Sequence, residues 1–243
     1  KDGVGEYMQR KRKVKKRTFR IYYCLIFLWV SLAVNAQMTE GEPPAHMTPK
    51  ELHTWNQRRT FRKEFVNIQT LSSDIILDIK YATADNFLKQ AVYDCPQCYL
   101  RKATAEALVA AQKEFVKRGY SLKLFDCYRP LSVQKKMWKI LPGTHYVANP
   151  AKGSKHNRGA AVDLTLVDLA TGKELDMGTP FDTFSPRAHH TYTQLPKEVL
   201  DNRKLLKEMM DKYNFKSIYS EWWHYEYRPE MASPVEDLPW ECP

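Results

Sequence analysis

The chain has 243 residues, of which 43% are hydrophobic and 27% charged, a composition typical of globular proteins and a length that allows one domain with a stable core. Its formal net charge of +10 would suit a nucleic-acid-binding protein, but residues 1–36 contain nine basic and two acidic residues, so the rest of the chain carries only +3. Because the basic residues are concentrated in this segment, the charge does not support a nucleic-acid partner for the folded domain.

The first 36 residues have the pattern of a secretory signal peptide. Basic residues at 10–13 and 15–17 precede an apolar run over 21–34, and small residues follow near position 36, which is the order of such a peptide. The apolar run is shorter than the roughly 20 residues that a membrane-spanning helix needs. We therefore expect an exported, periplasmic protein that starts at Met8, with residues 1–7 upstream and no stable membrane association after cleavage. An uncleaved membrane anchor is the alternative.

A proline-containing linker over 37–50 leads into one expected domain over 51–243. Hydrophobic periodicity and the positions of glycine and proline predict its elements. Strands are expected over 74–81, 121–127, 161–168 and 217–227, and helices over 103–118, 131–141 and 196–213. This irregular order favours an α+β domain over an alternating βαβ fold.

Four cysteines lie beyond the expected signal peptide: Cys95, Cys98, Cys127 and Cys242. The pair Cys95 and Cys98 could be half of a zinc knuckle or a redox pair, but a zinc ribbon needs a second Cys-x-x-Cys pair and the sequence contains none. We therefore expect a structural disulfide, which fits an oxidising compartment. Three pairings of the four cysteines are possible.

One carboxylate lies where a charge is costly. Asp163 is inside the apolar run 160–166, and a buried carboxylate must be paired or bound to a cation. His156, an ordinary loop histidine if taken alone, precedes it by seven residues, and His224 stands among aromatic residues that would shield a metal from water. Two imidazoles and one carboxylate are a ligand set suited to a catalytic zinc ion with an open water position.

Glu221 precedes His224 by three residues. It is not needed as a ligand and is free to act as the general base on a water molecule. Residues three apart on a flat strand point to opposite faces. The backbone must therefore turn or bulge between Glu221 and His224 if both are to reach one metal.

The pattern Ser-x-His-x-x-Gly-x-Ala-x-Asp over 154–163, followed by Glu-x-x-His over 221–224, resembles the zinc D-alanyl-D-alanine peptidase superfamily, which includes hedgehog-type folds. Within it the sequence is most similar to the D-alanyl-D-alanine dipeptidases of the vancomycin-resistance type. The segments 80–87, 126–130, 163–166 and 177–182 agree as well, in the family's order. The resemblance implies an α+β zinc peptidase domain with a small central antiparallel sheet flanked by helices.

The same resemblance implies a role for each matching residue. It makes His156, Asp163 and His224 the ligands of one Zn²⁺ per chain, Glu221 the catalytic base, and Arg129 the cation that stabilises the tetrahedral intermediate. Tyr81, Ser154 and Asp182 are implied to hold the dipeptide, with Asp182 binding its ammonium group. Taken alone, Arg129 would be interpreted as a surface arginine before Pro130.

The implied activity is zinc-dependent hydrolysis of the small dipeptide D-alanyl-D-alanine to D-alanine. One alternative is a D,D-carboxypeptidase or endopeptidase that acts on peptidoglycan stem peptides with the same metal ligands. A second is a non-catalytic zinc-binding module, against which the presence of both Glu221 and Arg129 argues. The oligomeric state and the physiological role (antibiotic resistance, wall recycling or use of D-alanine as a nutrient) stay open at this point.

Overall fold

The computed structural model describes residues 42–143, 146–240 and 242, so the expected signal peptide lies outside the described residues. The chain divides into two compact units, residues 1–59 and 60–243. Helix α2 (Pro49–Glu64) crosses this boundary and begins inside the expected linker; the domain limits at 36 and 50 stay predictions. In the part of the chain that the structure describes, the helices lack the length and hydropathy that crossing a membrane requires.

Helix α2 was not predicted, although its first turn carries a local signal for a helix start. The backbone N–H of Thr48 donates to the Glu51 carboxylate (2.8 Å), and the N–H of Glu51 donates to the Thr48 hydroxyl (3.3 Å). These reciprocal hydrogen bonds form a capping box, which satisfies backbone groups that the first helical turn leaves unpaired.

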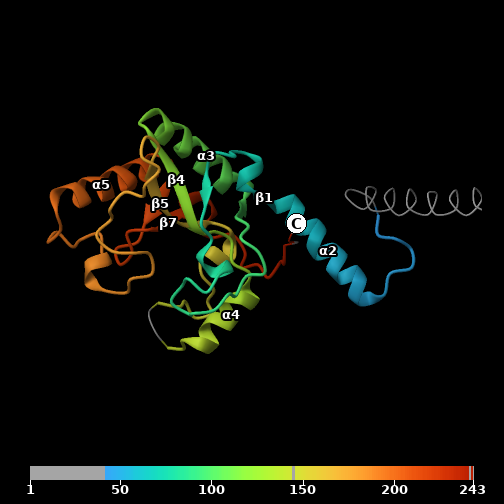
Figure 1. Cartoon of the computed structure of the whole chain (residues 1–243). Coiled ribbons are helices and arrows are strands. Elements are labelled where there is room, and N and C mark those ends of the chain that lie inside the picture. The colour runs from blue at the N-terminus through green and yellow to red at the C-terminus, as the bar shows by residue number, and fades with distance from the viewer. Residues whose placement is uncertain (1–41, 144–145, 241, 243) are drawn as a thin grey trace, which may run out of the picture. The chain divides into compact units, whose positions relative to one another are not determined.

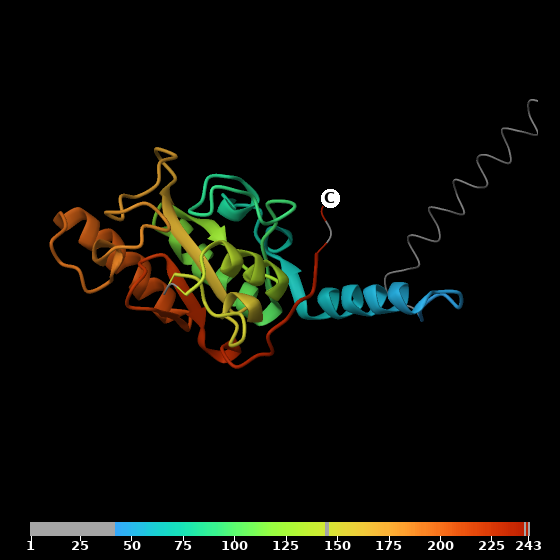
Figure 2. The same ribbon diagram turned by 90° about the horizontal axis from the view of Figure 1, so that it is seen from below.

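A mixed five-stranded sheet lies at the centre of the second unit (Figures 1 and 2). Its strands are β2 (Ile76–Leu77), β4 (Tyr120–Asp126), β5 (Ala161–Asp168), β7 (His224–Tyr227) and β6 (Phe215–Ser217), in that spatial order. All neighbours pair antiparallel except β2, which pairs parallel with β4. A separate antiparallel pair joins β1 (Phe65–Asn67) to β3 (Tyr99–Arg101).

Helices α3 (Lys102–Lys117), α4 (Leu131–Ile140) and α5 (Lys197–Lys212) pack around the sheet (Figure 1). Short 3₁₀ helices are η1 (Ile68–Thr70), η2 (Lys80–Ala82), η3 (His156–Arg158), η4 (Pro186–Ala188) and η5 (Arg228–Glu230). The expected α+β class is confirmed, with β2 as the exception to an antiparallel sheet.

Two of the four expected strands are shorter than predicted. The strand expected over 74–81 contributes only β2 and then turns into η2, which directs Tyr81 inward. The strand expected over 217–227 ends with β6 at Ser217 and resumes with β7 at His224. Trp222 and Trp223 are both almost fully buried. Because consecutive residues of a strand face opposite sides, burying both indoles in one core favours the bend seen here.

The hydrophobic core holds β5 in place. Val162, Leu164 and Leu166 alternate along the strand and belong to the same buried cluster as Leu108 and Phe115 of α3. Complete burial of a side chain of this size stabilises the folded state by roughly 1.5–3 kcal/mol. The odd-numbered residues of β5 therefore point to the opposite face, where Asp163 lies.

Strand register brings the polar residues onto this opposite face. Asp163 pairs directly with His224 across β5 and β7. Between β4 and β5 the register shifts after Leu124, so Asp126 stands opposite Asp163. Such a bulge inserts one extra residue and changes the direction of the next side chain. Asp126, Asp163 and His224 therefore share one face of the sheet.

Two disulfides join the four described cysteines, Cys95 to Cys242 and Cys98 to Cys127. Cys95 and Cys98 therefore each pair with a distant residue rather than with one another. The expectation of structural disulfides is confirmed, and one of the three possible pairings is selected.

Replacement of Gly159 tests the turn that follows His156. Gly159 ends η3 with a φ of +65°, and a Cβ atom there would lie 2.4 Å from the Phe65 ring. We expect Gly159→Ala to destabilise the protein by about 1–3 kcal/mol more than Gly172→Ala, because overpacking adds to the left-handed strain that both share. Gly172 has a φ of +69° with nothing within 4 Å of the added Cβ. Urea unfolding measures both, and equal losses would contradict this packing.

Candidate metal centre and active site

Three buried side chains bring their metal-binding atoms together at the centre of the sheet face. His156 Nε2 lies 3.2 Å from His224 Nδ1 and 3.4 Å from Asp163 Oδ1, and His224 Nδ1 lies 2.9 Å from Asp163 Oδ1. A tetrahedral zinc ion with bonds of about 2.0–2.1 Å places its ligand atoms roughly 3.3–3.4 Å apart. The three donors therefore fit a zinc ion, and among the described residues they form the cluster able to hold a metal.

The outer nitrogen of each imidazole contacts a group that fixes its tautomer. His156 Nδ1 donates to the backbone carbonyl of Cys127 (2.7 Å), which leaves a lone pair on Nε2. His224 Nε2 lies 3.5 Å from a carboxylate oxygen of Glu226, which favours a proton there and a lone pair on Nδ1. Contacts of this kind orient metal-binding histidines and increase their basicity.

The electrostatics show how strongly this cluster favours positive charge. Burial would raise the pKa of Asp163, but His156 and His224 beside it hold that pKa far below its usual range. Burial would lower the pKa of His224, yet its hydrogen bonds to Asp163 and Glu226 raise it to about 10. A cation is therefore stabilised at this point, whether it is a proton or a metal ion.

Glu221 lies at the wall of the same cavity, three residues before β7. The intervening Trp222 and Trp223 form a bend, so the predicted turn between Glu221 and His224 is confirmed. Burial raises the pKa of the Glu221 carboxyl group. A carboxylate with a raised pKa is a stronger base for taking a proton from water near neutral pH.

Arg129 is buried rather than on the surface, so its interpretation from local sequence alone is wrong. Its guanidinium donates from Nε (3.1 Å) and Nη2 to Asp126 Oδ2, and from Nη1 to Gln134 Oε1 (2.8 Å). It also lies 5.2 Å from the centre of the Tyr81 ring. Since a guanidinium has five N–H donors, these three bonds with described residues leave two N–H groups for the cavity that Arg129 lines.

Asp182 and Tyr81 form a polar pair at another side of the cavity. The Tyr81 hydroxyl donates to Asp182 Oδ2 (2.9 Å), which leaves Oδ1 for another partner. Asp182 adopts a φ of +57°, a conformation uncommon outside glycine that recurs at functional sites. Burial, and next the charge of Asp163, raise the pKa of Asp182 well above its usual value.

One cavity of about 400 Å³ joins these groups. Ser154 is at its wall, where the serine hydroxyl accepts a hydrogen bond from the backbone N–H of Asn157 (3.3 Å). All eight residues selected from the sequence line this cavity: Tyr81, Arg129, Ser154, His156, Asp163, Asp182, Glu221 and His224. Their individual roles stay predictions, but their convergence is a structural fact.

Several residues that complete the site were not predicted. Asp126, fully buried, accepts hydrogen bonds from the Tyr93 hydroxyl (2.6 Å) and from Arg129. Its position at a strand end, three residues before Arg129, could have indicated an ion pair between the two residues. Gln134 and Glu226 contact Arg129 and His224, but in the sequence they look like ordinary polar residues of a helix and a strand. Aromatic residues that also line the cavity are Phe87, Tyr146, Phe184 and Trp223.

Comparison with known proteins places this geometry in a family. The family model Peptidase_M15, described as D-ala-D-ala dipeptidase, matches residues 62–238. The D-alanyl-D-alanine dipeptidase of Escherichia coli (strain K12) is 38% identical over 170 residues, covering 70% of this chain and 87% of that protein. The D-alanyl-D-alanine dipeptidase of Enterococcus faecalis (strain ATCC 700802 / V583) is 34% identical over 182 residues, covering 67% and 90%.

Among solved structures, the LdcB LD-carboxypeptidase is similar over 53% of this chain and 59% of that chain, with 26% sequence identity and a TM-score of 0.35. The family match spans most of the unit that contains the sheet and the cavity. The chain therefore belongs to the D-ala-D-ala dipeptidase family of M15 peptidases.

Proposed function

We propose that this protein hydrolyses the dipeptide D-alanyl-D-alanine to D-alanine with one Zn²⁺ per chain, held by His156, Asp163 and His224. The observation that carries the proposal is a single cavity whose wall holds a buried three-ligand set, a carboxylate base and a fixed guanidinium. The names of the relatives, D-alanyl-D-alanine dipeptidases, support the choice of substrate.

The ligand residues supply the metal with two neutral imidazoles and one carboxylate. A zinc ion held there would act as a Lewis acid that polarises a peptide carbonyl and lowers the pKa of water. The Cys127 carbonyl and the Glu226 carboxylate contact the outer ring nitrogens, so the lone pairs of His156 Nε2 and His224 Nδ1 would be available to hold the ion. The aromatic side chain of Trp223 at the cavity wall limits access of bulk water.

Glu221 moves the proton in this mechanism. Its carboxylate takes a proton from the attacking water and then returns it to the leaving amine as the C–N bond breaks. Burial raises the pKa of Glu221, which suits both the base and the acid role near neutral pH. The other described carboxylates of the cavity have different contacts: Asp163 and Glu226 contact His224, and Asp182 accepts the Tyr81 hydroxyl.

Arg129 stabilises the charge that develops on the carbonyl oxygen during the attack. Asp126 and Gln134 hold its guanidinium at one position, so no reorganisation is needed when that charge appears. A positioned donor of this kind contributes roughly 3–4 kcal/mol to transition-state stabilisation. Burial would lower the pKa of Arg129, but Asp126 raises it well above the ordinary value, so the cation persists at every relevant pH.

Asp182 selects a free amino terminus. Its carboxylate has one oxygen available after the Tyr81 hydrogen bond, and an ammonium group fits that position. An acylated substrate would leave the half-buried carboxylate unpaired, which costs binding energy. Ser154 adds a hydroxyl donor to the same cavity. This arrangement favours a dipeptidase over a carboxypeptidase that acts on longer stem peptides.

We also propose that the protein works after export, in the periplasm, and that it has no nucleic-acid partner. The two disulfides support an oxidising compartment, since such bonds are rare where cells keep thiols reduced. Fractionation of expressing cells should recover the processed protein with periplasmic markers. Recovery of a reduced, unprocessed chain with cytosolic markers would contradict this location.

Hydrolysis assays with and without a chelator test the proposed activity. We expect purified protein to cleave free D-Ala-D-Ala, to lose this activity when a chelator removes the metal, and to regain it with zinc. N-acetyl-D-Ala-D-Ala is the matched substrate and should be cleaved poorly, because Asp182 has no ammonium partner. Efficient cleavage of the acetylated substrate would assign the protein to the carboxypeptidase class instead.

Replacement of Glu221 separates proton transfer from metal binding. Glu221→Gln should lower kcat by roughly 10²–10⁴-fold, while metal content and thermal stability stay near those of the wild type. The amide has the same shape but cannot accept the proton. Glu208→Gln, at an exposed position of α5, is the control and should be fully active. A Glu221→Gln protein with unchanged kcat would exclude the proposed base.

The pH dependence of KM tests Asp182. Because burial raises its pKa, the carboxylate takes up a proton at a higher pH than an exposed aspartate, and KM should rise as the pH falls through that raised pKa. Asp182→Asn should raise KM roughly 10- to 100-fold near neutral pH and remove this acidic limb. A wild-type limb that persists unchanged in Asp182→Asn would show that another group binds the ammonium.

A further inference from the structure

We propose that the Cys98–Cys127 disulfide is a positioning element of the active site: it fixes the backbone of Cys127, which in turn orients His156 for the metal and Arg129 for the reaction. This inference rests on the proposed role of His156 as a ligand. Cys98 lies outside the segments that carry the family resemblance, and Cys127 lies in the segment 126–130 beside Arg129 without an assigned role.

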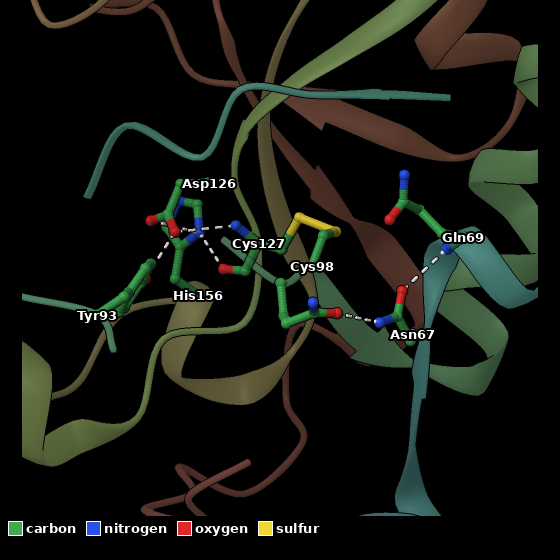
Figure 3. Close-up of a disulfide and its surroundings, with 8 residues drawn as sticks. Asn67, Gln69, Tyr93, Cys98, Asp126, Cys127 and His156 are labelled. Carbon is green, nitrogen blue, oxygen red and sulfur yellow. Dashed lines mark hydrogen bonds and ion pairs between the residues drawn. A yellow bond between two sulfur atoms is a disulfide. The ribbon is translucent and has the colours of Figure 1, made fainter. Parts of the chain in front are cut away.

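The first link runs from Cys127 to the metal centre. The Cys127 carbonyl accepts the hydrogen bond from His156 Nδ1 at 2.7 Å, and that bond selects the tautomer with a lone pair on Nε2. His156 is 4% exposed and Cys127 2% exposed, so the bond is shielded from bulk solvent; Asp126 Oδ2, 3.5 Å from the same nitrogen, is a second acceptor near it. Figure 3 shows His156 and Asp126 together at Cys127, with Cys98 on its other side.

The second link runs from Cys127 to the guanidinium. The backbone N–H of Cys127 donates to Asp126 Oδ1 (2.9 Å), and the other oxygen of that carboxylate accepts from Arg129. The Tyr93 hydroxyl completes the set at 2.6 Å (Figure 3). The two backbone groups of one residue therefore orient a metal ligand and the partner of the cation.

The disulfide holds Cys127 beyond the end of β4, next to the hydrogen bond from the Tyr128 N–H to the Tyr99 carbonyl (2.9 Å). Strand β4 ends at Asp126, so Cys127 lies beyond its ladder. Cys98 immediately precedes β3, and its carbonyl accepts the N–H of Ile68 (3.0 Å). The same strand holds the turn after η3, where the N–H of Arg101 donates to the Gly159 carbonyl (3.1 Å). The disulfide thus ties Cys127 to the strand that also anchors the His156 turn.

The second disulfide provides a matched control. Cys95–Cys242 joins residues separated by 147 positions and fixes the C-terminal tail, whereas Cys98–Cys127 spans 29 positions. Loop-closure entropy predicts a larger stability loss when the longer loop is opened. A general effect of lost stability would therefore harm the Cys95/Cys242 variant more, while a positioning effect would harm the Cys98/Cys127 variant more.

The experiment compares Cys98→Ala/Cys127→Ala with Cys95→Ala/Cys242→Ala in the full chain. Cobalt absorption spectra and chelator competition measure the metal site without any substrate, and steady-state kinetics with D-Ala-D-Ala follow. Removal of the first disulfide should weaken metal affinity by about 10- to 100-fold, change the cobalt spectrum and lower kcat more than it raises KM. The control should keep the wild-type spectrum, and its metal affinity should change by no more than about twofold, far less than the 10- to 100-fold loss expected for the first variant. A Cys98→Ala/Cys127→Ala protein with wild-type spectrum and affinity, or equal losses in both variants, would overturn the proposal.

A second measurement applies if Cys98→Ala/Cys127→Ala does not fold. In the Cys95→Ala/Cys242→Ala background, a phosphine reductant should release two new thiols, and metal affinity should fall as they appear and return on reoxidation. Unchanged affinity after the two thiols appear would overturn the proposal. Wild-type protein that binds cobalt but does not cleave D-Ala-D-Ala would contradict the proposed function alone, because the metal readouts need no substrate.

Discussion

The buried charge of Asp163 is the constraint on which the rest of this structure depends. Its carboxylate lies in the middle of β5, where every residue from Ala161 to Val167 is buried, and a bare charge there would be strongly unfavourable. Strand pairing supplies one compensating group, His224, directly opposite. The turn before β5 supplies His156. The resulting cluster satisfies the carboxylate only when it contains a cation.

Beside this centre, the buried charges of Asp126 and Arg129 compensate one another. Asp126 neutralises Arg129, accepts the Tyr93 hydroxyl and lies 3.5 Å from His156 Nδ1. In a medium of low dielectric such bonds are stronger and more directional than in water. The same low dielectric raises the pKa of Glu221 and Asp182 at the cavity wall. Burial therefore produces both the metal centre and the reactivity of the groups beside it.

The parts of the fold that could be predicted from sequence are those with local signals. The apolar run around Asp163 predicted β5 with its observed bounds, and helices α3, α4 and α5 followed from hydrophobic periodicity and from glycine and proline near their ends. The bend at Trp222 and Trp223 could be anticipated only as a requirement of geometry. The start of β7 depends on the tertiary packing of the two indoles, and a local strand pattern contains no information on that packing.

Other features depend on contacts between distant segments. The bulge in β4 that turns Asp126 toward the site is visible only in the register with β5. The cysteine pairing needs the positions of β3 and the C-terminal tail, because four cysteines allow three pairings. The roles of Tyr81, Ser154, Asp182 and Arg129 came from family resemblance, since their local sequences are those of ordinary strand-end and turn residues. The structure places all four at one cavity.

The most direct test of this explanation is a calorimetric titration of chelator-treated protein with Zn²⁺, for the wild type and for Asp163→Asn. We expect the wild type to bind one ion per chain with proton release, since the ligands must lose protons to bind. The isosteric variant should fold but bind zinc at least about 100-fold more weakly, because it lacks the charge that attracts the ion. Equal affinity in the two proteins, or no binding by the wild type, would contradict the assignment of these three residues as a metal centre.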